Sequence, residues 1–181
     1  MSSSTAQAAL HLADFQIQND AQLLQDAADE LQGIVLADEA DPERRRGLRR
    51  EALEGWLKLF AAIDGSLDPA FDPGDLPLLS VDPLPSDGVR FPPGVDPSRL
   101  TDAGARREYE QRIEANRRKA ERYTLQTKLR RLDERLTPRL EAFLRSAYST
   151  STEPEDRREV LEAVQATITS PARAERLRTL I

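Results

Sequence analysis

Prolines are distributed unevenly along this chain of 181 residues. Eight of the twelve lie in residues 67–98, and only four lie elsewhere. Proline has no amide hydrogen and is disfavoured inside helices and central strands, so this segment cannot form a long regular element. The flanking residues are rich in Ala and Leu and poor in β-branched residues, a composition that favours helices. The sequence therefore predicts an all-α fold interrupted by one extended connection.

The expected organisation has three segments and five to six unequal helices. Residues 1–66 are predicted to form an acidic helical hairpin, and residues 99–181 a basic-leaning helical bundle with one long helix. After Leu67, the segment of residues 67–98 carries nine further apolar Leu, Val and Phe side chains, unlike a flexible linker. We expect this segment to form an ordered strap over the helices, with docking on a partner as the alternative. The three segments are compatible with one compact domain.

Helical spacing predicts two helices in the hairpin. Leu10, Ile17, Leu24 and Leu31 recur every seven residues, which predicts a single helix over about 4–37 with these residues buried. Asp41 and Pro42 are typical of a cap and a first helical residue, and Gly65 of a stop after about Asp64. The second helix is expected to bury Leu48, Leu53, Trp56, Leu57, Phe60 and Ile63.

The C-terminal segment contains the predicted long basic helix over 105–136, with Thr101 as its cap. Its apolar stripe changes face near Tyr123. Three further helices are predicted to start at Thr137 and Pro138, at a capping box of Thr152 and Glu155, and at Ser170 and Pro171. The expected buried residues of the last three include Leu140, Phe143, Leu144, Ala147, Val160, Leu161, Val164 and Ile168.

The net charge of −6 conceals an asymmetry between the two halves of the chain. Residues 1–98 contain 18 acidic and 7 basic residues, whereas residues 99–181 contain 14 acidic and 19 basic ones. The first 41 residues contain eight acids and no Lys or Arg. Opposite charges can hold the halves of one fold together or attract a charged partner. For the asymmetry as a whole, we favour attraction between the two halves of one fold.

Several kinds of active site are disfavoured by composition. There is no cysteine and only one histidine, His11, so thiolate chemistry and His-rich metal sites are excluded. No glycine-rich phosphate loop is present. The sequence predicts no catalytic residue, metal or cofactor, although an enzyme using paired carboxylates stays open. Glu110 and Glu114 are the nearest candidates, but Arg106 and Arg118 lie at ion-pairing spacing and favour a solvated surface.

The first prediction of function is a non-enzymatic protein-interaction module that uses an acidic helical surface. An inhibitor, an immunity-type protein, a chaperone or an assembly adaptor would fit this description, and the partner would be a basic protein. The predicted contact residues are Asp14, Asp20, Asp26, Asp29 and Glu30.

The alternative prediction is binding of nucleic acid or phosphate through the long basic helix. Acids interleaved with its bases, including Glu114 and Glu121, weaken this alternative. The predicted contact residues are Arg117, Arg118, Arg122, Tyr123 and Arg131.

The chain is expected to be cytoplasmic and not to bind a membrane. No run approaches the roughly 18 apolar residues that a membrane-spanning helix needs, and the N-terminus does not resemble a signal peptide. An export signal removed before expression would leave the same sequence. The sequence does not predict an oligomeric state.

Overall fold

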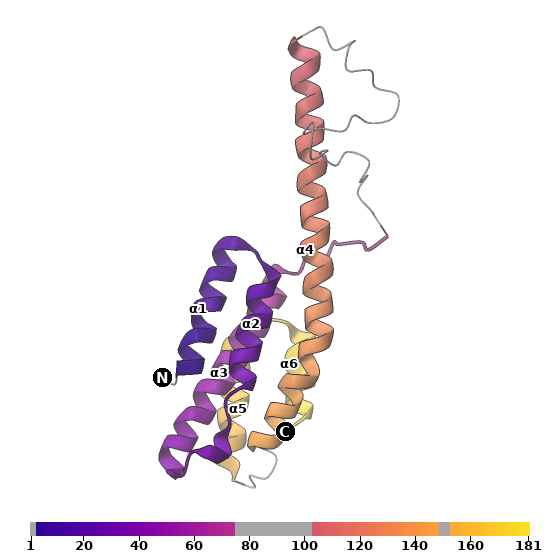
Figure 1. Ribbon diagram of the computed structural model, residues 1–181. Coiled ribbons are helices and arrows are strands. Elements are labelled where there is room, and N and C mark those ends of the chain that lie inside the picture. Colours follow the sequence, from indigo (N-terminus) through magenta and orange to yellow (C-terminus); the bar gives the residue numbers. More distant parts are fainter. Residues whose placement is uncertain (1–2, 75–102, 149–152) are drawn as a thin grey trace. The chain divides into compact units, whose positions relative to one another are not determined.

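The computed structural model describes residues 3–74, 103–148 and 153–181, and the regular elements in these ranges are helices. This confirms the all-α prediction and the expected five to six helices (Figure 1). The elements are α1 (Ser3–Gln18), α2 (Ala21–Gln32), the short 3₁₀ helix η1 (Leu36–Asp38), α3 (Pro42–Ser66), α4 (Ala103–Tyr148), α5 (Pro154–Thr167) and α6 (Pro171–Thr179).

The chain divides into two compact units. The first comprises Met1–Leu67 and Lys128–Ile181, and the second comprises Asp68–Thr127. The division falls within α4, so the first part of this helix belongs to the second unit and the remainder to the first.

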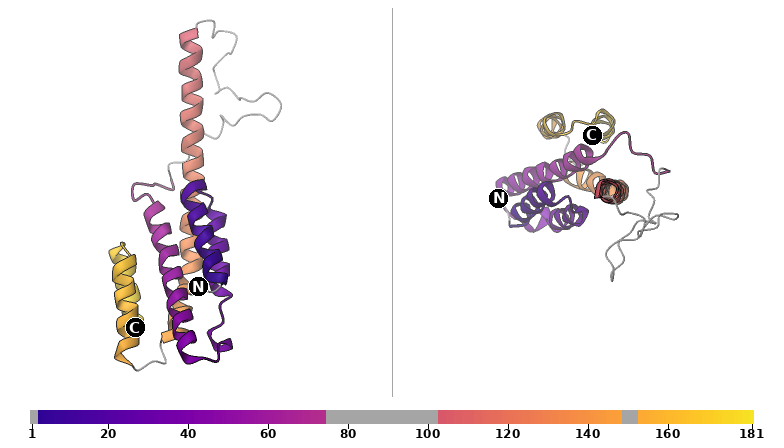
Figure 2. Two further views of the ribbon diagram at one scale, coloured as in Figure 1. Left: turned by 90° about the vertical axis from the view of Figure 1, so that its left-hand side faces the viewer. Right: turned by 90° about the horizontal axis from the view of Figure 1, so that it is seen from above.

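Helix α3 lies at the centre of the first unit. Figure 2 shows α5 and α6 on one side of α3, and α1 and α2 on the other. Its buried residues cover a wide arc of the helix, because both sides of α3 are packed. The predicted core residues Leu53, Trp56, Leu57, Phe60 and Ile63 are confirmed as buried, whereas Leu48 is only half-buried.

The predicted start of α3 is also confirmed. Asp41 precedes the helix, and its Oδ1 accepts a hydrogen bond from the Glu43 amide at 3.1 Å. Pro42 is the first helical residue, where its missing amide hydrogen is not needed. Helix α3 ends two residues beyond the predicted end at about Asp64, because it continues through Gly65 to Ser66 and the Leu67 amide still donates to the Ile63 carbonyl at 3.0 Å.

The prediction of a single helix over 4–37 is wrong, because the chain turns between α1 and α2. Asn19 has a φ of 52°, a left-handed conformation that asparagine adopts more readily than most residues. Asp20 then caps α2, and its side chain accepts a hydrogen bond from the Gln22 amide at 3.0 Å. The turn allows α2 to pack back against α1 (Figure 1).

The turn also changes which residues are buried. Leu24 and Leu31 are in the core as predicted, but Leu10 is 58% exposed and Ile17 is 80% exposed. A seven-residue spacing that crosses a left-handed turn no longer describes one face of one helix. Thr5, Ala8 and Phe15 form the buried side of α1 instead.

The predicted helix break at Thr137 and Pro138 is also wrong, because α4 continues through Pro138 to Tyr148. Proline deprives the Glu134 carbonyl of its helical hydrogen bond, but Glu134 and Pro138 are both exposed, so water can take its place. On the other side of the helix, Leu136, Leu140 and Leu144 are buried. Burial of this continuous apolar side favours a single helix over a restart.

The last two helices largely agree with the sequence. The Ser170 hydroxyl caps α6, with a distance of 3.4 Å from the Arg173 amide nitrogen to Oγ, and Pro171 is the first helical residue as predicted. The predicted capping box of Thr152 and Glu155 does not define the start of α5, because Glu153 precedes Pro154 as the N-cap and makes no side-chain cap hydrogen bond, and Thr152 lies outside the described residues. Val160, Val164 and Ile168 are buried, whereas Phe143, Ala147 and Leu161 are only half-buried.

Only the first residues of the predicted strap are described, and they lie on α4 within the second unit. The Asp68 amide donates to Gln126 Oε1 at 2.9 Å, and the Tyr123 hydroxyl donates to the Pro73 carbonyl at 2.9 Å. The rings of Phe71 and Tyr123 are 5.3 Å apart. Thr101 and residues 75–98 lie outside the described residues, so the ordered strap stays a prediction.

Candidate interaction surface

The five acids predicted to contact a partner lie on α1, on α2 and at the turn between them. Asp14 is exposed on α1, and Asp20 caps α2. Asp26 accepts a hydrogen bond from Gln22 Nε2 at 3.0 Å. Asp29 accepts from Gln25 Nε2 at 2.9 Å and also pairs with Arg139 Nη1 at 3.1 Å. Glu30 is half-buried on α2.

These acids therefore differ in whether their side chains also stabilise the fold. The Asp20 carboxylate is needed for the helix cap, and Asp29 connects α2 to α4, so changing either also disturbs the fold. The side chains of Asp14 and Glu30 make no hydrogen bond or ion pair in the described part of the chain. They are the acids best suited to test binding separately from stability.

An apolar crest, formed by Leu10 and Ile17, runs along the outer side of α1. The two residues are two helical turns apart and face away from the buried side of α1. Together with Val35, which is 53% exposed, they are the exposed large hydrophobic residues of the described chain. All three belong to the 41-residue segment that lacks Lys and Arg. The seven-residue spacing identifies Leu10 and Ile17 as one apolar side of a helix, but it predicts that this side is buried, whereas the structure leaves it exposed.

A groove of about 500 Å³ lies between α1 and α3. The two helices are adjacent at one end of it, where the Thr5 hydroxyl donates to Glu51 Oε2 at 3.2 Å. Sequence reasoning missed this groove, because it depends on which helices become neighbours. Its lining residues are Thr5, Ala9, Leu12, Ala13 and Gln16 from α1, and Glu51, Glu54, Gly55, Lys58 and Ala62 from α3.

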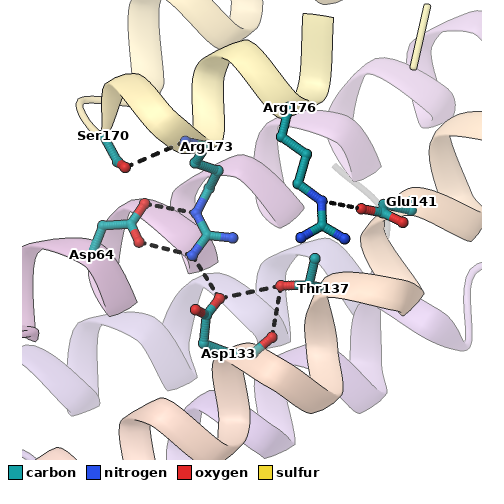
Figure 3. A network of polar contacts seen from close by, with 7 residues as sticks. All are labelled: Asp64, Asp133, Thr137, Glu141, Ser170, Arg173 and Arg176. Carbon is teal, nitrogen blue, oxygen red and sulfur yellow. Dashed lines mark hydrogen bonds and ion pairs between the residues drawn. The ribbon is translucent and has the colours of Figure 1, made fainter. Parts of the chain in front are cut away.

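The Arg173 cluster lies within the first unit and joins three helices (Figure 3). Arg173 of α6 donates to both carboxylate oxygens of Asp64, at 2.8 and 2.9 Å, and to Asp133 at 2.6 Å. The guanidinium lies 4.5 Å from the centre of the Phe60 ring. Burial lowers the pKa of Arg173, but the hydrogen bonds to Asp64 and Asp133 outweigh it and raise the pKa overall. The cluster is therefore a permanently charged connection between α3, α4 and α6.

The Arg49 cluster makes a second connection, between α3, α4 and α5. Arg49 donates to both Asp156 carboxylate oxygens, at 2.8 and 3.2 Å, and to Glu159 at 3.2 Å. Its guanidinium lies 4.3 Å from the centre of the Tyr148 ring. Burial lowers the pKa of Arg49, but its hydrogen bond to Asp156 and the nearby charges raise it overall.

Tyr148 has a raised pKa in this environment. Burial disfavours the phenolate, and the carboxylates of Glu159 and Asp156 disfavour it further. Arg49 acts in the opposite direction but does not compensate for these effects. The phenol therefore keeps its proton at higher pH in the folded protein than in the unfolded chain.

Four of the residues predicted to bind phosphate are already engaged within the second unit. Arg117 and Arg118 pair with Glu114 at 2.6 and 3.4 Å, which lowers the pKa of Glu114, chiefly through the Arg117 hydrogen bond. Arg122 forms an ion pair with Asp68. Tyr123 contacts the ring of Phe71. Glu110, the other half of the carboxylate pair considered above, is exposed on α4.

Arg131 lies instead in the first unit, in a groove of about 610 Å³ between α2 and α4. Lys128 and Arg135 of α4 line the same groove, together with the Asp20 and Gln22 side of α2. In the described residues, none of the three cations forms an ion pair. They are a second charged surface, opposite in sign to the acidic segment.

No group of three or more His, Asp or Glu side chains is placed to hold a metal ion within residues 3–74, 103–148 and 153–181. Over the same ranges, no helix has the length and apolar character needed to cross a membrane. Models of protein families, curated proteins and solved structures all gave no match to this chain.

Replacing Arg173 by alanine should destabilise the protein by about 2–4 kcal/mol, because Asp64 and Asp133 would keep their charges without a partner. Urea unfolding at neutral pH measures this loss. Arg176 is the matched control, since it lies on the same helix and pairs with Glu141 at 2.7 Å but is 63% exposed. Arg176→Ala should cost less than about 1 kcal/mol. Equal losses for the two variants would contradict the assigned role of the Arg173 cluster.

Tyr148 should make stability fall at alkaline pH. Its raised pKa means that the unfolded chain loses this proton near pH 10, while the folded protein retains it. Stability is therefore complete below about pH 10 and decreases above it, by up to about 1.4 kcal/mol per pH unit. Tyr148→Phe should have a shallower slope of unfolding free energy between about pH 9 and 11 in urea titrations. If the unfolding free energy of the unaltered protein and of Tyr148→Phe falls equally steeply with pH, Tyr148 is not the source of the alkaline loss.

Proposed function

We propose that this chain is a non-enzymatic protein-interaction module that binds a basic partner through its acidic N-terminal segment. An inhibitor, an immunity-type protein, a chaperone or an assembly adaptor would each use such a surface. The observation that carries the proposal is the coincidence of two features. The exposed large hydrophobic residues of the described chain, Leu10, Ile17 and Val35, all lie in the segment of 41 residues with eight acids and no Lys or Arg.

The two features supply different parts of a binding free energy. An Ile side chain that is 80% exposed loses contact with water when a partner covers it, and this loss favours association. Surrounding acids accelerate the approach of a basic protein and disfavour acidic competitors. An apolar patch alone would attract many partners, whereas an acidic rim makes it selective.

The test is affinity capture from a lysate of the source organism, with the full chain as bait. We expect a stoichiometric basic protein, and its capture should fall at least about tenfold with Leu10→Ser/Ile17→Ser and with Asp14→Lys/Glu30→Lys. Asp20 and Asp29 are left unchanged because both also support the fold. Glu121→Lys/Glu175→Lys reverses two acids outside the N-terminal segment and is the charge-matched control. Capture that survives both N-terminal double variants would refute the proposed surface.

A second proposal is phosphate or nucleic-acid binding, and it is now centred on Lys128, Arg131 and Arg135. These cations line one groove and have no acidic partner in the described chain, which leaves them available to anions. Asp20 and Glu134 line the same groove and reduce its positive charge.

This second proposal predicts binding of single-stranded or duplex nucleic acid at low salt, with an affinity that falls steeply as salt is added. Replacing Lys128, Arg131 and Arg135 by Gln should abolish most of it, whereas replacing the paired residues Arg117 and Arg118 should have a smaller effect. Fluorescence anisotropy with labelled oligonucleotides provides the measurement. If neither the single-stranded nor the duplex oligonucleotide binds at low salt, this function is excluded.

A further inference from the structure

We infer that the groove between α1 and α3 binds a single amphipathic helix of the partner, with basic side chains flanking its apolar face. The inference rests on the proposed function, and it names the part of the surface that is occupied and the chemistry of the occupant. It depends on the shape of the groove, its lining and the charges at its edges.

The groove has the dimensions of a short helix. Its lining extends from Thr5 to Gln16 on α1 and from Glu51 to Ala62 on α3, eleven residue steps on each helix. At 1.5 Å per residue this is about 16 Å, or three helical turns. The Thr5–Glu51 hydrogen bond lies at the first residue of both stretches, so the two helices run parallel along the groove. Parallel walls three turns long suit a rod-shaped ligand.

The lining of the groove is mainly apolar. Ala9, Leu12 and Ala13 of α1 and Gly55 and Ala62 of α3 line it, and most of the exposed lining surface belongs to carbon atoms. Ala13 and Ile17 are four residues apart and are therefore neighbours on the surface of α1. The apolar surface thus continues from the groove to the crest formed with Leu10, which gives a partner helix more area than the groove alone.

A helix fits this lining better than an extended peptide. The backbone groups of α1 and α3 are already hydrogen-bonded within their helices, so they offer an extended peptide no partners. An extended chain pressed on an apolar floor would leave its own amides and carbonyls unsatisfied. A helix satisfies them internally and presents only side chains, as in other helix-in-groove complexes.

The charges at the edges select a basic helix. Glu51 and Glu54 line the α3 side, and the α1 side contributes no Lys or Arg. Glu54 is only loosely held by Arg50, at 3.7 Å, and Arg50 is largely exposed, so a stronger partner can displace it. Lys58 is the one cation among the lining residues, and it lies toward the end occupied by Gln16 and Ala62. The first 41 residues of a second copy of this chain contain no Lys or Arg, so that segment would not supply the basic side chains that the groove favours.

The experiment uses the full chain and two synthetic helical peptides of about 14 residues, each with Leu at the spacing of one helix face. The remaining positions are mostly Lys in one peptide and Glu in the other. We expect the Lys peptide to bind, and the Glu peptide to bind at least about tenfold more weakly, in titrations by fluorescence anisotropy. Equal binding of the two peptides would overturn the charge assignment.

Two alanine substitutions locate the binding site. Ala13→Arg places a long charged side chain at the groove and should weaken binding of the Lys peptide at least about tenfold. Ala142→Arg adds the same charge at an exposed position of α4 and should change binding less than about twofold. Glu54→Lys should improve binding of the Glu peptide. Circular dichroism and urea unfolding confirm that each variant is folded.

The outcomes separate this inference from the proposed function. Equal effects of Ala13→Arg and Ala142→Arg, or no binding of the Lys peptide to the unaltered chain, would overturn the groove as a helix site. So would a dimer in sedimentation experiments that Ala13→Arg dissociates, because the occupant would then be a second copy. Capture of a basic partner that depends on Asp14 and Glu30 but not on Ala13 would leave the proposed function standing without this inference.

Discussion

Two ion-paired arginines hold the first unit together. Arg49 lies near the start of α3, and Arg173 of α6 contacts α3 near its end. Arg49 binds Asp156 and Glu159 near the start of α5, and Arg173, at the start of α6, binds Asp64 near the end of α3. Each pair joins residues more than 100 positions apart. Charges that are largely removed from water are stable only when they are paired. The helices of the C-terminal part must therefore take the positions in which these pairs can form.

Between the two clusters, apolar packing decides how closely the helices approach. Trp56 and Phe60 are fully buried on α3, and Gly55 lies beside them. A Cβ atom at Gly55 would come within 2.6 Å of Leu31 Cδ2, so the absence of a side chain lets α2 lie close to α3. Once α2 occupies this place, the turn at Asn19 positions α1 as an outer helix with one buried side. The opposite side, with Leu10 and Ile17, stays exposed.

The proposed function follows from this excess of apolar surface in an acidic segment. A helix at the edge of a bundle needs only one apolar side, and α1 has two. Eight acids without a Lys or Arg give such a segment a negative charge that opposes pairing with a second segment of the same charge. The groove beside it has two acids of its own, Glu51 and Glu54 of α3, and the proposed basic helix would complement them.

The sequence by itself determined the helical class, the starts of α3 and α6 and most of the α3 core, because caps and apolar spacing are local properties that tertiary contacts seldom reverse. It did not determine the turn at Asn19 or the passage of α4 through Pro138, since these depend on burial gained elsewhere in the fold. It predicted the five acids of the candidate surface but not the groove or the exposed crest. Only the tertiary structure decided which apolar stripe was buried, because the core has room for one side of α1 and a repeat of seven residues does not say which.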